Sequence, residues 1–243
     1  MATEIIAKEL YGGEVKINFY PNSHRYKLEG SKTYLVGVTT ALGMIAKPQL
    51  IGWAARMATE YIQEAHEDGR SMTEELFEAA KNAHRRKKEE AGASGSLVHE
   101  WAENYIKTGA DELPEDGNVL NGVLAFLKWV KAHKVKFTSS ERIVYSRKHG
   151  YVGTLDAEAE IDGKLCVIDF KTSSGIYPEM HLQTAAYQKA AEEEGSEYTG
   201  HRWIVRFDKT TGEFEAVQAK EIRGAFKAFK AALALKQWSK ARS

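Results

Sequence analysis

The sequence predicts an α/β fold in which helices cover a mixed β-sheet. Three observations lead to this class. A mostly helical stretch occupies residues 39–133, a series of strand patterns follows over 140–210, and one helical pattern interrupts that series. We expect one domain spanning residues 1–243, with a β segment over about 1–35 before the helical part and a final helix over 220–240.

The first half of the chain is expected to hold a short β region and then helices. Strands over 15–20 and 24–28 flank Pro21-Asn22-Ser23, a combination that favours a turn. Residues 39–106 are mostly helical in pattern, including 49–65 and 73–90, and Thr73 is a suitable N-cap. The small residues at 92–95 predict a break before a further helix over 96–107.

The second half alternates between the two patterns. A helix is expected over 118–133, and its buried stripe comprises Val119, Val123, Phe126, Leu127 and Val130. Strands are expected over 142–146, 153–161, 164–171 and 201–207. Pro178 and Gly195 suit the start and the stop of a helix over 179–194. The final helix, over 220–238, has one apolar side made of Ile222, Phe226, Phe229 and Leu233.

Asp162-Gly163 predicts a tight hairpin between the strands over 153–161 and 164–171, because both turn residues need a positive φ. With these two residues as the loop, Ile161 lies opposite Lys164. Counting back along both strands then places Asp156 opposite Asp169. A four-residue loop centred on the same pair keeps this register, whereas a three-residue loop would shift it.

The opposed carboxylates predict a cation site. Directly opposed residues have Cβ atoms roughly 4.5–5.5 Å apart, where like charges repel, and a hard divalent cation is the usual compensation. Lys171 lies one pleat from Asp169, on the same face. A solvated acidic edge strand is the alternative. The core face is expected to comprise Leu155, Ala157, Ala159, Ile161, Cys166, Ile168 and Phe170.

The composition excludes several protein classes. Hydrophobic residues make up 43% and charged residues 28% of the chain, as in ordinary globular proteins. Neither a run of about 20 apolar residues nor a secretory signal pattern is evident, so we expect no membrane association. The single cysteine, Cys166, excludes an internal disulfide and a four-cysteine metal site, and it favours a reducing, cytoplasmic setting.

The charge balance does not favour nucleic-acid binding by itself. The chain has 34 Lys and Arg against 34 Asp and Glu, whereas many nucleic-acid binders have a basic excess. Local basic patches occur at residues 85–88, 147–148 and after 220. Each patch is equally well explained as a solvated helix face or as a phosphate contact.

Asp169-Phe170-Lys171 is the triplet most suited to catalysis. Glu14-Val15-Lys16 and Asp162-Gly163-Lys164 match the same acid-x-lysine pattern, so the triplet alone is a weak indication. Only the triplet at 169–171 combines an apolar strand, an acid and a lysine on one face, and a second acid across a tight hairpin.

Several other polar residues are candidates for the same site. His99 lies at the rim of the apolar stripe of its helix, although a partly buried structural histidine is favoured when that helix is taken alone. Gln183 and Tyr187 are four residues apart and so share a helix face. Thr172 and Ser173 begin a hydroxyl-rich loop that suits phosphate oxygens. An exposed glutamine on a capped helix is the competing interpretation.

In combination, these residues resemble the PD-(D/E)XK nuclease superfamily, specifically its RecB-like and phage recombination exonuclease branch. The matching pieces occur in the family's order over residues 92–190, and residues 37–42 resemble the amino-terminal part of phage members. Two positions depart from the family pattern: Leu155 stands in place of the proline, and Asp169 in place of the more usual glutamate. The matching pieces are 95–99, Glu141, 153–156, 167–173 and 183–187.

The resemblance implies a restriction-endonuclease-like core with an amino-terminal, mostly helical part, together forming a single nuclease domain. It implies Asp156 and Asp169 as metal ligands and Lys171 as the catalytic lysine. His99 and the carbonyl oxygen of Phe170 would be further ligands of Mg²⁺ or Mn²⁺, and the imidazole nitrogen would favour Mn²⁺.

The resemblance also implies supporting roles. Glu141 and Gln183 would support the metal-bound water or the lysine, and Tyr187 would support the substrate strand. Members of this branch that hold an iron–sulfur cluster use four cysteines, so the single cysteine of this chain excludes that subgroup.

We therefore expect a metal-dependent DNA exonuclease of recombination or repair, acting in the cytoplasm of a bacterial or phage-infected cell. Its partners would be DNA and a single-strand annealing or recombination protein, and a homo-oligomer is left open. A sequence- or structure-specific endonuclease is one alternative, but no base-reading element is evident. A non-catalytic DNA-end binding module is the other, and Lys171 argues against it.

Overall fold

The computed structural model describes residues 5–242. The chain divides into two compact units, Met1–Ile45 with Val98–Ser243 and Ala46–Leu97. The larger unit is α/β, with a mixed sheet and helices packed against it, which confirms the predicted class. None of the helices within residues 5–242 is both long and apolar enough to cross a membrane.

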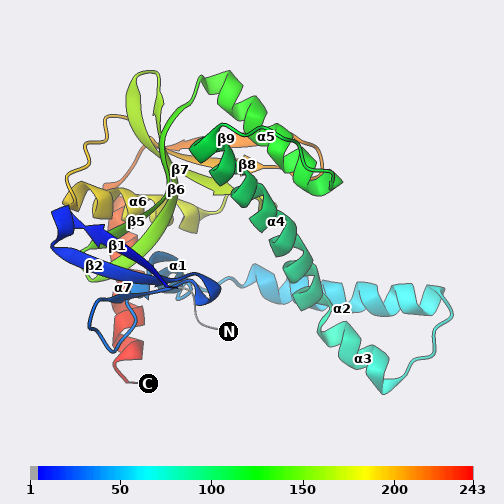
Figure 1. The fold of residues 1–243 in the computed structure, drawn as a ribbon. Coiled ribbons are helices and arrows are strands. Elements are labelled where there is room, and N and C mark those ends of the chain that lie inside the picture. Colours follow the sequence, from blue (N-terminus) through cyan, green and yellow to red (C-terminus); the bar gives the residue numbers. More distant parts are fainter. Residues whose placement is uncertain (1–4, 243) are drawn as a thin grey trace. The chain divides into compact units, whose positions relative to one another are not determined.

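The larger unit is built on a six-stranded mixed sheet (Figure 1). The strands follow the order β4-β6-β7-β8-β9, and β5 pairs with β6. β4 is parallel to β6 and β7 is parallel to β8, while the other pairs are antiparallel. The strands are β4 (Val36–Gly37), β5 (Lys136–Ser146), β6 (Tyr151–Ile161), β7 (Lys164–Lys171), β8 (Arg202–Phe207) and β9 (Phe214–Ala219).

Two apolar clusters hold helices against this sheet. One cluster joins Leu155 and Val167 to α6 (Pro178–Glu193), α7 (Arg223–Lys240) and the short α1 (Val38–Leu42). The other joins Ile168 and Phe170 to α5 (Gly117–His133) and to Val98 and Ala102 of α4 (Ala83–Thr108). Because β6 and β7 contribute to both clusters, apolar packing fixes the position of this hairpin from two sides.

A three-stranded antiparallel sheet precedes the main sheet. It consists of β1 (Ile6–Leu10), β2 (Val15–Tyr20) and β3 (Arg25–Leu28), with short 3₁₀ turns at Tyr11–Gly13 and Pro21–Ser23. Its buried Ile17 and Tyr26 belong to the same apolar cluster as Ile143 and Val152 of β5 and β6. The two strands predicted here are confirmed to within one residue, and β1 was not anticipated.

The smaller unit contains α2 (Gln49–Glu67), α3 (Glu74–Lys81) and the first part of α4. Thr73 Oγ1 accepts a hydrogen bond from Leu76 N, which confirms the predicted cap. The helix expected over 73–90 is divided after Lys81. The break expected at 92–95 was wrong, because α4 continues through it as a 26-residue helix. Two glycines cost only about 1 kcal/mol each in a helix, so the surrounding helical residues outweigh them.

Most of the remaining elements agree with expectation except at their ends. β6, β7, β8, α5 and α6 match the predicted ranges to within two residues. β5 begins at Lys136, six residues earlier than expected, and α7 begins at Arg223, three residues later. β9 was not anticipated, since its sequence, Phe214–Ala219, follows a polar turn and has a mostly half-exposed pattern.

Candidate active site

The hairpin of β6 and β7 has the predicted turn and register. Asp162 and Gly163 have φ angles of 52° and 72°, as a two-residue turn of this kind requires. Ile161 pairs with Lys164, and the pairing continues without a shift along both strands. The local chemistry of the Asp-Gly turn therefore fixes which residues of the two strands face each other.

Asp156 and Asp169 are the next opposed residues beyond the last regular pair, Ala157 with Ile168. Here a side chain replaces the backbone ladder, because Asp156 Oδ2 accepts a hydrogen bond of 2.6 Å from Phe170 N. Asp156 is partly buried, whereas Asp169 is fully buried. The two carboxylates thus lie where β6 and β7 separate.

β6 has an interrupted edge at this point. β5 occupies one edge along almost the whole strand, so β4 and β7 must share the other. β4 pairs with Tyr151 and Val152, and β7 pairs from Ala157 onward. Within the described chain, residues 153–156 therefore have no strand partner on this edge. Asp156 lies at the end of that gap.

The main sheet is also irregular at Asp156. Leu155 packs in the cluster with α6, whereas Ala157 packs in the cluster with α5. Side chains two residues apart in a regular strand share a face. On the neighbouring β5, Glu141 has a positive φ of 49° and is skipped by the pairing with β6. The prediction that Leu155 shares the face of Ala157 was therefore wrong, because the irregularity at Glu141 and Asp156 reverses the alternation.

Lys171, which is partly buried, forms an ion pair with the fully buried Asp169. Lys171 Nζ lies 2.5 Å from Asp169 Oδ2 and donates a hydrogen bond of 3.1 Å to Phe170 O. Burial lowers the pKa of Lys171, but the carboxylates of Asp169 and Asp156 outweigh it and raise that pKa, so the ammonium group stays charged. Burial raises the pKa of Asp169 to about 6, with Lys171 opposing and Asp156 adding to the shift.

His99 on α4 and Glu141 on β5 complete the cluster of titratable groups. The rings of His99 and Phe170 meet edge to face, with centroids 6.3 Å apart. Burial, assisted by the charge of Lys171, lowers the pKa of His99 to about 4, so the imidazole is neutral at pH 7. Burial, assisted by the charge of Asp156, raises the pKa of Glu141 to about 8, so this carboxyl group is largely protonated.

Gln183 and Tyr187 on α6 lie against the same site. Gln183 Nε2 donates a hydrogen bond of 2.9 Å to the Tyr187 hydroxyl. Tyr187 is buried, and its pKa is raised by burial and then by the carboxylates of Asp169 and Asp156. The structure therefore brings together seven residues that the sequence indicated: His99, Glu141, Asp156, Asp169, Lys171, Gln183 and Tyr187.

Gly153 allows Tyr187 to approach the gap in β6. A Cβ atom at residue 153 would lie 2.5 Å from Tyr187 Cε1 and 3.1 Å from Val38 Cγ2. We expect Gly153→Ala to lower the free energy of unfolding by about 1–3 kcal/mol through overpacking. Gly92→Ala is the control, since nothing lies within 4 Å of the added atom and alanine favours a helix by about 1 kcal/mol. Urea denaturation of both variants measures the difference, and equal stabilities would contradict the expected clash.

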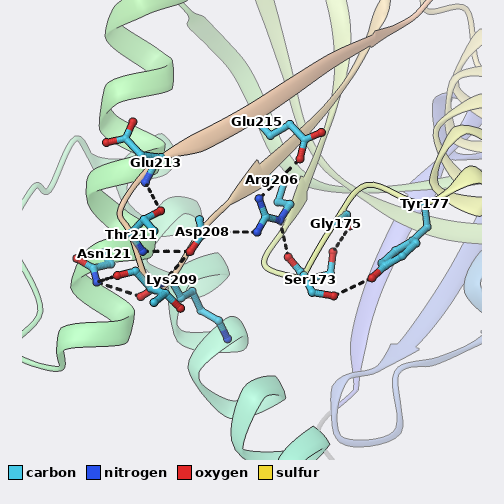
Figure 2. Close-up of polar contacts among 12 residues, drawn as sticks. Asn121, Ser173, Gly175, Tyr177, Arg206, Asp208, Lys209, Thr211, Glu213 and Glu215 are labelled. Atoms are coloured by element: carbon cyan, nitrogen blue, oxygen red, sulfur yellow. Dashed lines mark hydrogen bonds and ion pairs between the residues drawn. The ribbon is translucent and has the colours of Figure 1, made fainter. Parts of the chain in front are cut away.

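The loop after Lys171 is held by a hydrogen bond within the loop and by one from Arg206 of β8 (Figure 2). Ser173 Oγ donates to Gly175 O at 2.8 Å, and Arg206 Nε donates to Ser173 O at 2.7 Å. Arg206 in turn pairs with Asp208 at 2.8 Å. A hydroxyl has one hydrogen to donate, so the phosphate contact expected of Ser173 requires that hydrogen to be redirected. The neighbouring Thr172 is partly exposed.

Two residues near the site were not anticipated from the sequence. The Tyr26 hydroxyl lies 2.7 Å from Thr154 Oγ1 and 3.1 Å from His24 Nε2. Burial raises the pKa of Tyr26 to about 12, and the nearby carboxylate of Glu141 adds to the shift. Since Tyr26 and Thr154 are 128 residues apart, no local pattern could have indicated this contact.

A cavity of about 430 Å³ lies beside the gap in β6. Residues 153–154 and Tyr187 form part of its wall. Its cationic lining residues are Arg25, Lys236 and Lys240, and no Asp or Glu belongs to the described residues that line it. In a chain of zero net charge, this gives the cavity lining a local excess of positive charge.

The donor atoms of the site suit a divalent cation. Both carboxylate oxygens of Asp169 are buried and accept no hydrogen bond, although Oδ2 lies 2.5 Å from Lys171 Nζ. Such atoms are costly unless they are compensated. Within residues 5–242, no group of three or more His, Cys, Asp or Glu side chains lies close enough together to hold a metal ion. By their chemistry, Asp156, Asp169, the neutral His99 and the Phe170 carbonyl would be the ligands.

No family model matches the chain, and no curated protein sequence matches it. Among solved structures, that of the protein SSO0001 is similar over 50% of this chain and 58% of its own, with 16% sequence identity and a TM-score of 0.32. The chain thus spans little more than half the length of that structure. A similarity of this size decides neither the fold family nor the function.

Proposed function

We propose that this chain is a metal-dependent deoxyribonuclease of the PD-(D/E)XK superfamily, with a restriction-endonuclease-like core, and that it digests DNA from an end. The observation that carries the proposal is the cluster at the interrupted edge of β6. There a pair of aspartates, a partly buried lysine, a neutral histidine and a glutamate with a positive φ come from β5, β6, β7 and α4.

A structural explanation accounts less well for this cluster. Ionised carboxylates are rarely buried beside one another in a fold that needs them only for stability, because desolvation and repulsion both oppose it. Here Asp169 is fully buried with Asp156 as an electrostatic neighbour, and burial raises the pKa of both groups. Perturbed groups of this kind, gathered at one place, are typical of functional sites.

The adjacent cavity supports a polyanionic substrate. Arg25, Lys236 and Lys240 supply positive charge to a cavity that shares Gly153, Thr154 and Tyr187 with the surroundings of the site, and its described lining residues include no Asp or Glu. Phosphate groups of nucleic acids bind to such cationic surfaces, and this contact dominates their affinity. Tyr34 also lines the cavity, and its ring holds the guanidinium of Arg25 at 5.1 Å and the ammonium of Lys27 at 4.4 Å.

The charge states of the chain's own groups suit phosphodiester hydrolysis. A bound divalent ion would supply Lewis acidity at the scissile phosphate and a lowered pKa for the attacking water. Lys171 remains protonated, so it can donate hydrogen bonds to phosphoryl oxygens as negative charge builds on them. Glu141 carries a proton near pH 7 and can exchange it with water or a leaving oxygen.

The test compares a linear duplex labelled at one end, the same DNA as a single strand, and a closed circular plasmid. We expect Mg²⁺ or Mn²⁺ to support digestion of linear DNA, EDTA to stop it, and the closed circle to remain intact. Cleavage of the circle would indicate an endonuclease instead. Metal-dependent binding without cleavage would indicate a DNA-end binding module, and inactivity with every metal and substrate would contradict a nuclease.

A further inference from the structure

A buried hydrogen bond joins the amino-terminal sheet to β6 near the candidate active site, and the proposed nuclease mechanism does not involve it. Tyr26 on β3 is 2% exposed. Its hydroxyl lies 2.7 Å from Thr154 Oγ1 on β6 and 3.1 Å from His24 Nε2. This contact joins two sheets that also share the apolar cluster of Ile17, Ile143 and Val152.

Thr154 lies in the part of β6 that pairs with a neighbouring strand on one edge only. Residues 153–156 pair with β5 on one edge, while the edge shared by β4 and β7 is open there. Asp156 is at the end of this segment, two residues after Thr154. The position of its carboxylate therefore depends on side-chain contacts as well as on backbone pairing.

Two such contacts act on the start of the segment. Tyr187 packs against Gly153 on one side. The Tyr26 hydroxyl bonds to Thr154, and Tyr26 is also an electrostatic neighbour of Glu141 and Tyr187. The amino-terminal sheet thus reaches the site through the buried hydroxyl group of Tyr26.

We propose that Tyr26 is a positioning residue of the active site, whose hydroxyl holds Thr154 and, through it, the segment that carries Asp156. The effect on turnover rests on the proposed nuclease function, whereas the effect on metal affinity and on the order of residues 153–156 does not. Tyr26 lines the cationic cavity but is 2% exposed, so it would act through Thr154 and not by binding the substrate. The sheet of β1 to β3 is then a part of the catalytic unit.

Tyr26→Phe, Thr154→Val and the double variant test this role. Each substitution removes one hydroxyl group, and a neutral hydrogen bond of this kind corresponds to about a 2- to 12-fold change in an equilibrium. We expect kcat on linear DNA with Mn²⁺ to fall about 10-fold in each single variant, with KM within about two-fold. The double variant should fall no further than Tyr26→Phe, because all three variants lose the bond between Tyr26 and Thr154 and the double variant adds no other loss.

Two measurements without DNA accompany the kinetics. The dissociation constant for Mn²⁺, obtained from the metal-dependent shift in melting temperature, should rise by about the same factor as kcat falls. Hydrogen–deuterium exchange should become faster within residues 151–157 and stay unchanged elsewhere. Tyr20→Phe is the control, because Tyr20 is on β2 of the same sheet and its ring packs on Tyr34. We expect it to behave as wild type.

The outcomes separate the two proposals. Additive losses in the double variant, a change in KM alone, or unchanged kcat and Mn²⁺ affinity would overturn the positioning role. If the wild-type protein binds Mn²⁺ but cleaves no DNA, the nuclease assignment fails and the comparison of dissociation constants still decides the role of Tyr26. A wild-type protein that neither binds Mn²⁺ nor cleaves DNA overturns both.

Discussion

Lys171→Ala should reduce the rate of DNA cleavage by about 10²–10³-fold, the range observed when one preorganised donor to a developing oxyanion is removed. The reason is that Lys171 is the one cation in direct contact with the carboxylate pair in the described structure, at 2.5 Å from Asp169. The measurement is a time course on end-labelled linear DNA with saturating Mn²⁺.

Two further variants make this result interpretable. Lys164→Ala removes an exposed lysine at the hairpin turn, from the acid-x-lysine triplet that has no opposed acid, and should leave the rate unchanged. Lys171→Arg keeps a positive charge beside the buried Asp169 and so guards against loss of the fold. If Lys171→Ala is folded, as judged by its melting curve, and cleaves as fast as wild type, the catalytic role of Lys171 is wrong.

The part of the site that could be predicted from sequence is the part that local chemistry determines. Asp162 and Gly163 fix a two-residue turn, the turn fixes the register, and the register places Asp156 near Asp169. The helix spacing of Gln183 and Tyr187 is equally local. Each step uses residues that are close in the chain, where backbone preferences and periodicity are informative.

The rest of the site depends on contacts between distant segments. The bond between Tyr26 and Thr154 and the packing of Tyr187 on Gly153 have no local pattern. The reversed alternation at Asp156 arises because β5 carries a matching irregularity at Glu141, which no single-strand pattern could indicate. The resemblance to a known family placed Glu141 among the candidates, but its left-handed backbone and raised pKa came only with the structure.

Asp156→Asn should abolish most of the stabilisation of the fold by Mn²⁺. At a free concentration about 100-fold above its dissociation constant, a ligand that binds only the folded state stabilises it by about 2.7 kcal/mol. For a chain of this size, that corresponds to a rise of roughly 5–10 °C in melting temperature. The variant loses one carboxylate ligand, but its amide oxygen can still accept the hydrogen bond from Phe170 N.

The melting temperatures of the metal-free proteins are the reference for this prediction. Replacing Asp156 removes a negative charge that raises the pKa of the buried Asp169, so the metal-free variant should melt at or above the temperature of wild type. Asp162→Asn is the matched control, because asparagine tolerates the left-handed conformation of the turn and residue 162 lies far along the hairpin from the site. It should shift with Mn²⁺ as wild type does. An equal shift in Asp156→Asn would place the metal elsewhere, and the two aspartates would then be a repulsive pair without compensation.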